Sequence, residues 1–328
     1  MIKLQKFDNL TLLPMLGAHM PLILQTENLD ELMEVQQGWD LDYRILDTGD
    51  FEFSLYSEGI DGFQIDLEIW SRSIEVCGTS PDDSFSFVMP AYEDTSFLSR
   101  GKLVDARGLA IYEPGSDLHA VIGEARALLA VSIDKNLICD HAGGALGERL
   151  TGINANHLVL PEPVEMPRML RANLIGAALS GAISRETSST WIRDEIMLGI
   201  ATILLDGGVN RTSPGKEARY RIARLAQDIM LRDLGDPPTL LMVCEELEVS
   251  ERTLFYAFTD IFGTTPKAFL RIQRLQACRK LIGLDNPNDN ITGIMTRFGF
   301  YDAGHFAKDY RNVYGELPSD TLRSSRQK

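Results

Sequence analysis

The fold is decided near the C-terminus by the stretch Asn290–Pro318, NITGIMTRFGFYDAGHFAKDYRNVYGELP. In its first part apolar residues follow Asn290 at helical spacing, and asparagine is a residue type that caps helix N-termini. Gly299 then supplies the positive φ that a tight turn needs, and Asp302 begins a second helix. The stretch therefore predicts two short helices joined by a turn, each with one apolar stripe.

The face of the second helix opposite its apolar stripe is small, polar and basic. A helix pair with one packed face and one such face is typical of a helix-turn-helix, whose second helix enters the major groove of DNA. His305 is a candidate for reading a base, against an ordinary exposed helix residue, and we favour its contact with DNA. The residues on this face are Ala303, Gly304, His305, Ala307, Lys308 and Arg311.

The same pattern occurs once before, over residues 239–262. Both copies end at an aromatic residue followed by glycine, with a proline three positions after that glycine. A helix over residues 266–284 joins the copies and would be roughly 28 Å long. This length is comparable to the ~34 Å between successive major-groove faces, so both second helices are expected to enter adjacent grooves. Lys267, Arg271 and Arg274 share one face of the joining helix and are candidates for phosphate contact, against a merely solvated face.

Charge is distributed unevenly along the chain. The 328 residues carry a formal charge of −15, which by itself argues against DNA as a partner. Residues 1–216 hold 16 Lys and Arg against 32 Asp and Glu, a net of −16, whereas residues 217–328 hold 16 against 15, a net of +1. The second part can therefore bind phosphate if its cations share a face.

The N-terminal half is predicted to be rich in β-strands. Period-2 alternation in FEFSLYS, GFQIDLEIW and SFSFVM, separated by turn residues, indicates antiparallel hairpins between residues 41 and 131. About eight short strands favour a small barrel or a two-layer sandwich. Helical spacing returns at about 165–182 and 189–205, and the segment DGGVNRTSPGK marks a domain boundary.

Residues Ser250–Leu275 and Ile291–Pro318 closely resemble the AraC/XylS family of transcription regulators. The resemblance covers about residues 219–322 and rests on two helix-turn-helix units that recur at fixed spacing with their capping residues. It implies a DNA-binding domain of seven helices and sequence-specific control of transcription, usually activation.

The resemblance implies that the first recognition helix presents Arg252, Phe255 and Tyr256 to DNA. Tyr256 stands where the family often has arginine, which removes a phosphate or guanine contact. Phe255 would contact a thymine methyl group, while Arg252 and Lys308 would reach guanine. Ala303 and its neighbour Gly304 leave little for direct base readout in the second unit.

The N-terminal half resembles the family's cupin-like effector domains followed by a helical dimerisation element. Gln37–Leu55 also resembles the subset related to the ethanolamine-operon regulator, whose ligands are too varied to transfer. A cupin-type metalloenzyme is the competing class, but the five histidines are dispersed and form no HxH pair. We therefore predict no catalytic residue, metal or cofactor. The candidates for an effector pocket, against ordinary sheet packing or surface, are Tyr56, Glu68, Trp70 and Arg72.

We expect an α+β protein with a β-barrel or cupin-like sensing domain over residues 1–163 and a helical dimerisation pair over 164–206. A linker over 207–216 would lead to an all-α DNA-binding domain over 217–328. The expected function is that of an effector-responsive activator of a metabolic operon, acting as a cytoplasmic homodimer with no membrane contact. Its expected partners are double-stranded DNA, RNA polymerase and a small-molecule effector. The alternative is an effector-independent regulator whose N-terminal domain only dimerises.

Overall fold

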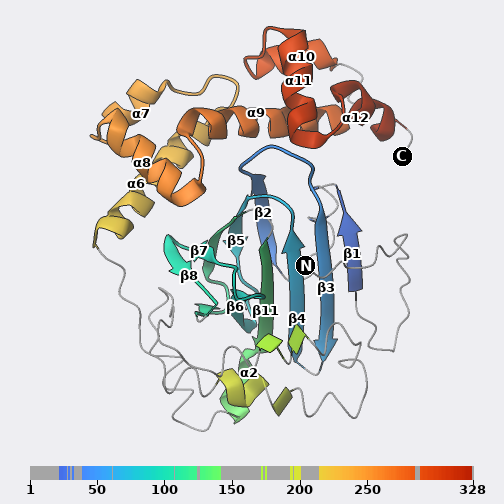
Figure 1. Ribbon diagram of the computed structural model, residues 1–328, viewed down its shortest axis with the longest axis vertical. Helices are drawn as coiled ribbons and strands as arrows, with labels where there is room; N and C mark the ends of the chain where they lie inside the picture. Colours follow the sequence, from blue (N-terminus) through green and yellow to red (C-terminus); the bar gives the residue numbers. More distant parts are fainter. Residues whose placement is uncertain are drawn as a thin grey trace.

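The chain is β-rich in its first part and helical in its last part, as the computed structural model shows (Figure 1). This arrangement confirms the predicted α+β class. The structure describes residues 22–27, 29, 32, 39–60, 62–106, 108–123, 126–141, 171–172, 174–175, 193–194, 196–200, 214–284 and 289–326.

The described strands form two antiparallel sheets, each open at both edges, so they are packed layers and not a closed barrel. The six-stranded sheet runs β1 (Leu22–Thr26), β3 (Phe53–Ile60), β4 (Phe63–Trp70), β11 (Arg126–Asp134), β6 (Ser84–Pro90) and β9 (Ala110–Tyr112). The five-stranded sheet runs β2 (Asp40–Ile45), β5 (Ile74–Thr79), β10 (Asp117–Ile122), β7 (Phe97–Ser99) and β8 (Lys102–Val104).

Alternation along β4 places side chains in two separate cores, because successive side chains of a strand point to opposite faces. Trp70 is buried between the sheets, with its ring centroid 4.2 Å from that of Phe53. Ile65 lies on the outer face of the six-stranded sheet, in a core shared with Ile138 of α2 (Lys135–His141). Leu174, Ile196 and Ile200 belong to the same outer core. Most of the predicted dimerisation pair, residues 164–206, lies outside the described residues.

Seven helices are described between residues 214 and 325, the number that the family resemblance implied. They are α6 (Pro214–Leu231), α7 (Leu240–Glu246), α8 (Glu251–Phe262), α9 (Pro266–Gly283), α10 (Ile291–Arg297), α11 (Ala303–Tyr314) and α12 (Pro318–Ser325). The first begins at Pro214, three residues before the expected start of the domain, since proline is well tolerated at the first helical position. No helix in the described part of the chain has the length and apolar character needed to cross a membrane.

Capping residues fix both helix-turn-helix units. The side chains of Ser250 and Asp302 accept hydrogen bonds from the backbone amides at the starts of α8 and α11, each worth about 1 kcal/mol. The same two helices end at Gly263 and Gly315, whose φ angles of 66° and 72° are disfavoured for residues with a Cβ. The local sequence signals therefore determine where both recognition helices begin and end.

Helix α9 lies across one end of the two sheets, with α6–α8 near its first residues and α10–α12 near its last (Figure 1). The first helix-turn-helix has a core that includes Phe258 and Phe262. The second has its own core around Phe306 and Tyr310. Both units are thus joined by one helix, with the first unit near its start and the second near its end (Figure 1).

Candidate nucleic-acid interface

The first recognition helix, α8, exposes an aromatic and cationic face. Phe255 and Tyr256 are 45% and 52% exposed, although large apolar rings are normally buried. Their ring centroids lie 6.1 Å apart in an edge-to-face arrangement, and the Arg252 guanidinium lies 5.4 Å from the centre of the Tyr256 ring. The face therefore offers apolar contact together with one positive charge.

The second recognition helix, α11, exposes a smaller face. His305 and Lys308 are exposed, as are the two small residues of its first turn, Ala303 and Gly304, and Arg311 in its last turn. Asp302 caps the helix, and its Oδ1 accepts from the backbone amide of His305 at 2.7 Å. This bond, together with the imidazole of His305, lowers the pKa of the Asp302 carboxyl. A face with so few long side chains permits close approach of a DNA backbone.

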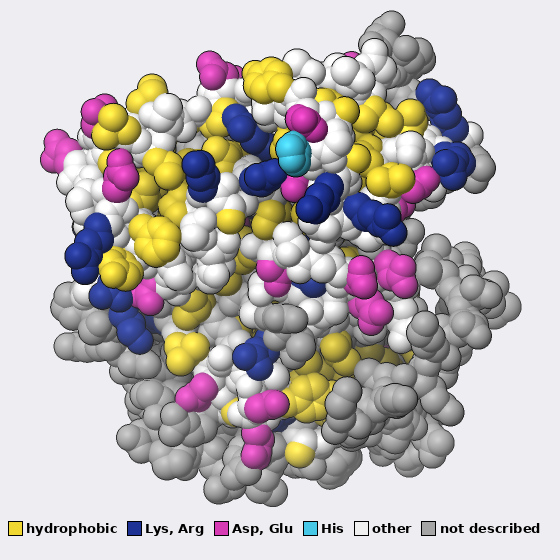
Figure 2. Space-filling view, turned by 45° about the horizontal axis from the view of Figure 1, so that its top comes forward, with side chains coloured by type: hydrophobic (Ala, Val, Ile, Leu, Met, Phe, Trp, Pro, Cys, Tyr) yellow, Lys and Arg dark blue, Asp and Glu magenta, His cyan; other side chains and the backbone are white. Residues whose placement is uncertain are grey.

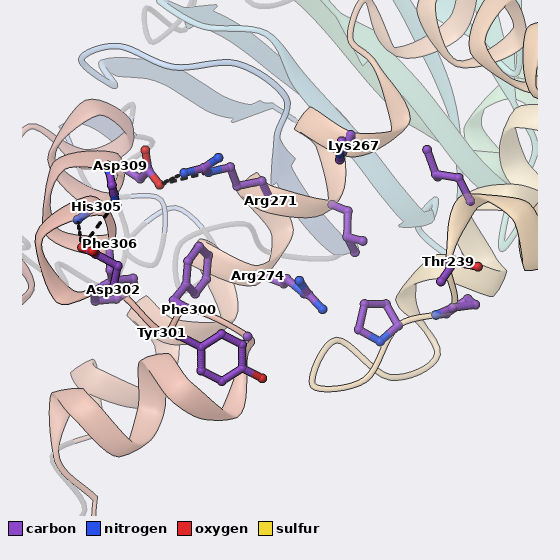
Figure 3. Close-up of a pocket in the computed structure, with 15 residues that line it drawn as sticks. Thr239, Lys267, Arg271, Arg274, Phe300, Tyr301, Asp302, His305, Phe306 and Asp309 are labelled. Carbon is purple, nitrogen blue, oxygen red and sulfur yellow. Dashed lines mark hydrogen bonds and ion pairs between the residues drawn. The ribbon is translucent and has the colours of Figure 1, made fainter.

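A groove of about 810 Å³ lies between the two units (Figure 3). Its floor is the exposed face of α9, one wall is the start of α7 at Thr239, and the other wall is α11 with the turn before it. Figure 2 shows Lys and Arg side chains across this face of the molecule, with hydrophobic side chains among them. The groove is thus open, concave and lined by cations of the linker helix.

The three linker cations have different environments within this groove. Lys267 is exposed. The Nε of Arg271 donates to Oδ2 of Asp309 on α11 at 2.9 Å (Figure 3). The Nε of Arg274 donates to the carbonyl oxygen of Leu234 at 3.1 Å. Lys267 is therefore the cation of this set best placed to reach phosphate, whereas Arg271 and Arg274 join parts of the protein.

Tyr301 is a residue that the sequence pattern did not single out. It lines the groove immediately before the Asp302 cap, and it is 82% exposed. An aromatic ring so exposed at the entrance to a recognition helix has no role in the core. The signal that would have found it is the sequence FYDAGH, in which one of two consecutive aromatic residues must lie outside the apolar stripe.

The four candidates for an effector pocket are not brought together. Tyr56 donates a hydrogen bond to Glu58, and Trp70 is fully buried in the core between the sheets. Arg72 is directed toward the helical part, where its Nη1 donates to the Val313 carbonyl at 2.6 Å. Glu68 lines a cavity of about 50 Å³ between the sheets, where its neighbours include Asp66.

Two capped helix-turn-helix units on one linker helix, with both recognition helices exposed, define a DNA-binding transcription regulator. A family model described as "Helix-turn-helix domain" matches residues 243–324. The chain is 32% identical over 149 residues to "XylDLEGF operon transcriptional activator 2" of Pseudomonas putida, a match that covers 43% of this chain and 91% of that protein. The chain belongs to the AraC/XylS family of transcription regulators.

A second curated relative matches over a smaller part of its length. The chain is 37% identical over 110 residues to "Probable thc operon regulatory protein" of Rhodococcus erythropolis, and this match spans 33% of each protein. Among solved structures it is similar to the AraC-like transcriptional activator CuxR, at 15% identity and a TM-score of 0.45, over 78% of this chain and 94% of that one. The chain thus spans about a third of the length of the curated relatives that match it first.

Proposed function

We propose that this chain activates transcription of a metabolic operon by placing α8 and α11 in successive major grooves of one operator duplex. The observation that supports this most directly is that α8 and α11 both expose their recognition faces, while cations of α9 line the groove between the two units. The direction of control is suggested by the relatives from Pseudomonas putida, which are named operon transcriptional activators.

The two units have different roles in this proposal. Phe255, Tyr256 and Arg252 read bases, because an apolar ring matches the C5 methyl of thymine and a guanidinium matches guanine. The small face of α11 approaches the backbone closely, with His305 and Lys308 as its longer side chains, and it reads groove shape more than base edges. Lys267 contacts a phosphate between the two grooves.

The cavity between the sheets is our candidate effector site. Its lining includes Asp66 and Glu68, and the described residues that line it include no Lys or Arg. Burial raises the pKa of Asp66, although hydrogen bonds from Ser57 and Gln64 oppose this. A volume of about 50 Å³ holds roughly three or four water-sized groups. We propose a small effector with an apolar body and a hydrogen-bond donor, such as an amine, facing Asp66.

The remaining parts of the proposal concern assembly. Sensing is assigned to residues 1–163, dimerisation to 164–206, a linker to 207–216 and DNA binding to 217–328. Operators of symmetric dimers repeat their half-sites, so a homodimer would place two copies of the paired reader on one promoter. Contact with RNA polymerase from this position would then favour initiation of transcription in the cytoplasm.

The test is selection of the full chain on a library of random duplexes, followed by footprinting of the DNA that is recovered. We expect protection of two short segments about one helical turn apart for each chain. Recovery of no sequence, or protection of one segment alone, would contradict binding of one duplex by both recognition helices. A reporter carrying the selected site upstream of a promoter then separates activation from repression.

A further inference from the structure

Three cores meet on α9. Phe269 is buried in the core of the first helix-turn-helix, and Leu275 is buried in the core of the second. Between them, Ile272 is buried in the core that lies between the two sheets. Because the two helix-turn-helix cores contain different residues, their relative orientation depends on α9 and on what holds that helix.

The middle of α9 covers the edge of the five-stranded sheet. Among the described strands β2 lies at the edge of its sheet, so the backbone groups on its outer side have no partner in a described strand. The Nε2 of Gln273 donates to the Ile45 carbonyl at 3.1 Å, and the Nε2 of Gln276 donates to the Tyr43 carbonyl at 2.9 Å. Two amides one helical turn apart thus tie the linker helix to the sheet.

The first helix-turn-helix is held through α6 by the buried carboxylate of Glu75 on β5. Its Oε1 accepts from Arg224 at 3.0 Å and from Nε2 of His119 at 2.8 Å, and its other oxygen accepts from Gln227. Burial would raise the pKa of Glu75, but the hydrogen bond from His119 and the positive charges around it lower this pKa to about 2. Glu75 is therefore an ionised and multiply bonded attachment point for α6.

The same cluster does not have the character of a metal site, although Glu75, Cys77 and His119 place possible ligand atoms within 4.8 Å of one another. The guanidinium of Arg44 lies 3.3 Å from Sγ of Cys77, and that of Arg224 lies 3.6 Å from it. Burial raises the pKa of the Cys77 thiol to about 12, so the thiol keeps its proton. Two guanidinium groups beside these ligand atoms disfavour a further cation there by charge repulsion.

The second helix-turn-helix is held at the C-terminal end of α11. Nη1 of Arg72 donates to the Val313 carbonyl at 2.6 Å, and the backbone amide of Gly49 donates to the Asn312 carbonyl at 2.9 Å. Asp47 orients this contact, since its Oδ1 accepts from Nε of Arg72 at 2.9 Å. A cation at the end of a helix also interacts favourably with the helix dipole.

We propose that the N-terminal sheets determine which half-site spacing the protein accepts in DNA, by holding the two helix-turn-helix units at one separation and angle. The sheets contact α6, the middle of α9 and the end of α11, and they leave the recognition faces of α8 and α11 exposed. Gln273, Gln276, Glu75 and Arg72 are therefore positioning residues that act on DNA through the helices they hold. This inference rests on the proposed function.

The experiment uses the full chain and the duplex selected by the wild type, with 0, 1 or 2 base pairs inserted between its two segments, and a duplex with only the first segment. The double variant Gln273→Met/Gln276→Met keeps side-chain length and helix propensity but removes both donors to β2. The milder Gln276→Met covers the case in which the double variant does not fold. Lys280→Met, on an exposed position of the same helix, is the matched control.

We expect the wild type and Lys280→Met to prefer the selected spacing over the 2-base-pair insertion by at least tenfold. In the glutamine variants this preference should shrink at least threefold, while affinity for the single segment stays unchanged. An unchanged spacing preference in both glutamine variants overturns the proposal. A uniform gain in affinity at every spacing also overturns the proposal, because the contacts between the sheets and the helices would then inhibit DNA binding. Failure of the wild type to select any duplex refutes the proposed function instead.

Discussion

Arg271 and Asp309 form an ion pair that joins the linker helix to the second recognition helix (Figure 3). Their side chains are 56% and 21% exposed, so solvent screens the pair, and pairs of this kind contribute only ~0–1 kcal/mol to stability. The acid neutralises a cation that otherwise faces the groove. Asp309 therefore limits the attraction of this surface for phosphate.

Removing that acid should strengthen binding to DNA of any sequence. In Asp309→Asn the guanidinium of Arg271 becomes available to phosphate, and one further contact steepens the slope of log K against log salt by about 1. Binding titrations with the selected duplex and with random duplexes at several salt concentrations measure this slope. An unchanged slope would mean that Arg271 does not reach DNA. Asp260→Asn, which frees Arg219 away from the groove, is the control.

The aromatic face of α8 should make the protein sensitive to thymine methyl groups. Replacing single thymines of the selected site by deoxyuridine removes one methyl each, and we expect a loss of about 0.8 kcal/mol, or roughly fourfold, where Phe255 makes contact. Phe255→Ala should bind more weakly and lose this sensitivity. Leu241→Ala, which truncates a similarly exposed apolar residue on α7, should retain it. Equal sensitivity in Phe255→Ala would remove Phe255 from the reading surface.

The small residues of α11 should matter because of the space they leave. Ala303 is exposed, so Ala303→Leu should change the free energy of unfolding by no more than ~0.5 kcal/mol. The added side chain should nevertheless hold α11 away from the DNA backbone and weaken specific binding.

The longer side chains of the two recognition helices should contribute through base contacts. Lys308→Ala and Arg252→Ala should each cost ~1–3 kcal/mol of binding free energy if they contact bases. Unchanged affinity in both would show that the recognition surface has been assigned to the wrong residues.

Local signals in the sequence predicted the helical part well. The caps at Ser250 and Asp302 and the glycines at 263 and 315 act within a few residues of themselves, so reading the chain in order finds them. Local patterns did not find β1, which lies before residue 41, and they did not place β2 at a sheet edge under α9. Strand order depends on pairing between distant segments, which no local pattern encodes.

The long-range polar contacts escaped prediction for the same reason. Glu75 and Arg224 are separated by 149 positions, and nothing in the alternation of β5 indicates that this carboxylate binds a helix. Arg72 was a candidate for an effector pocket, against ordinary sheet packing or surface. The structure instead directs it to the end of α11, since the strand has ended and the chain turns there.

Attachment of the sheets to α6 should weaken at mildly acidic pH. Burial lowers the pKa of His119, although Glu75 opposes this shift. The neutral imidazole can make both of its hydrogen bonds, because Nε2 donates to Glu75 and Nδ1 accepts from the hydroxyl of Tyr220. A group whose pKa is lowered on folding contributes stability above its unfolded value of ~6.5, and that contribution declines as pH falls. Arg44, Arg224 and Cys77 also face this cluster, but they do not change charge between pH 5.5 and 7.5.

Melting temperatures measured from pH 7.5 to 5.5 test this dependence. The wild type should lose stability over the interval. His119→Gln should start lower at pH 7.5 and show a flatter profile, because glutamine cannot take up a proton. A profile as steep in His119→Gln as in the wild type would assign the pH dependence to other groups.

The cavity between the sheets predicts the chemistry of the effector. Short primary amines should raise the melting temperature more than alcohols or carboxylates of the same size, because the carboxyl-bearing residues Asp66 and Glu68 line the cavity. An amine at a hundred times its Kd would add about 2.7 kcal/mol, a shift of several degrees. Asp66→Asn should abolish the difference between amine and alcohol, while Asp117→Asn, at an exposed position of β10, should preserve it. Equal shifts of the melting temperature with amines, alcohols and carboxylates, or no shift with any of them, would favour the alternative in which the N-terminal domain only dimerises.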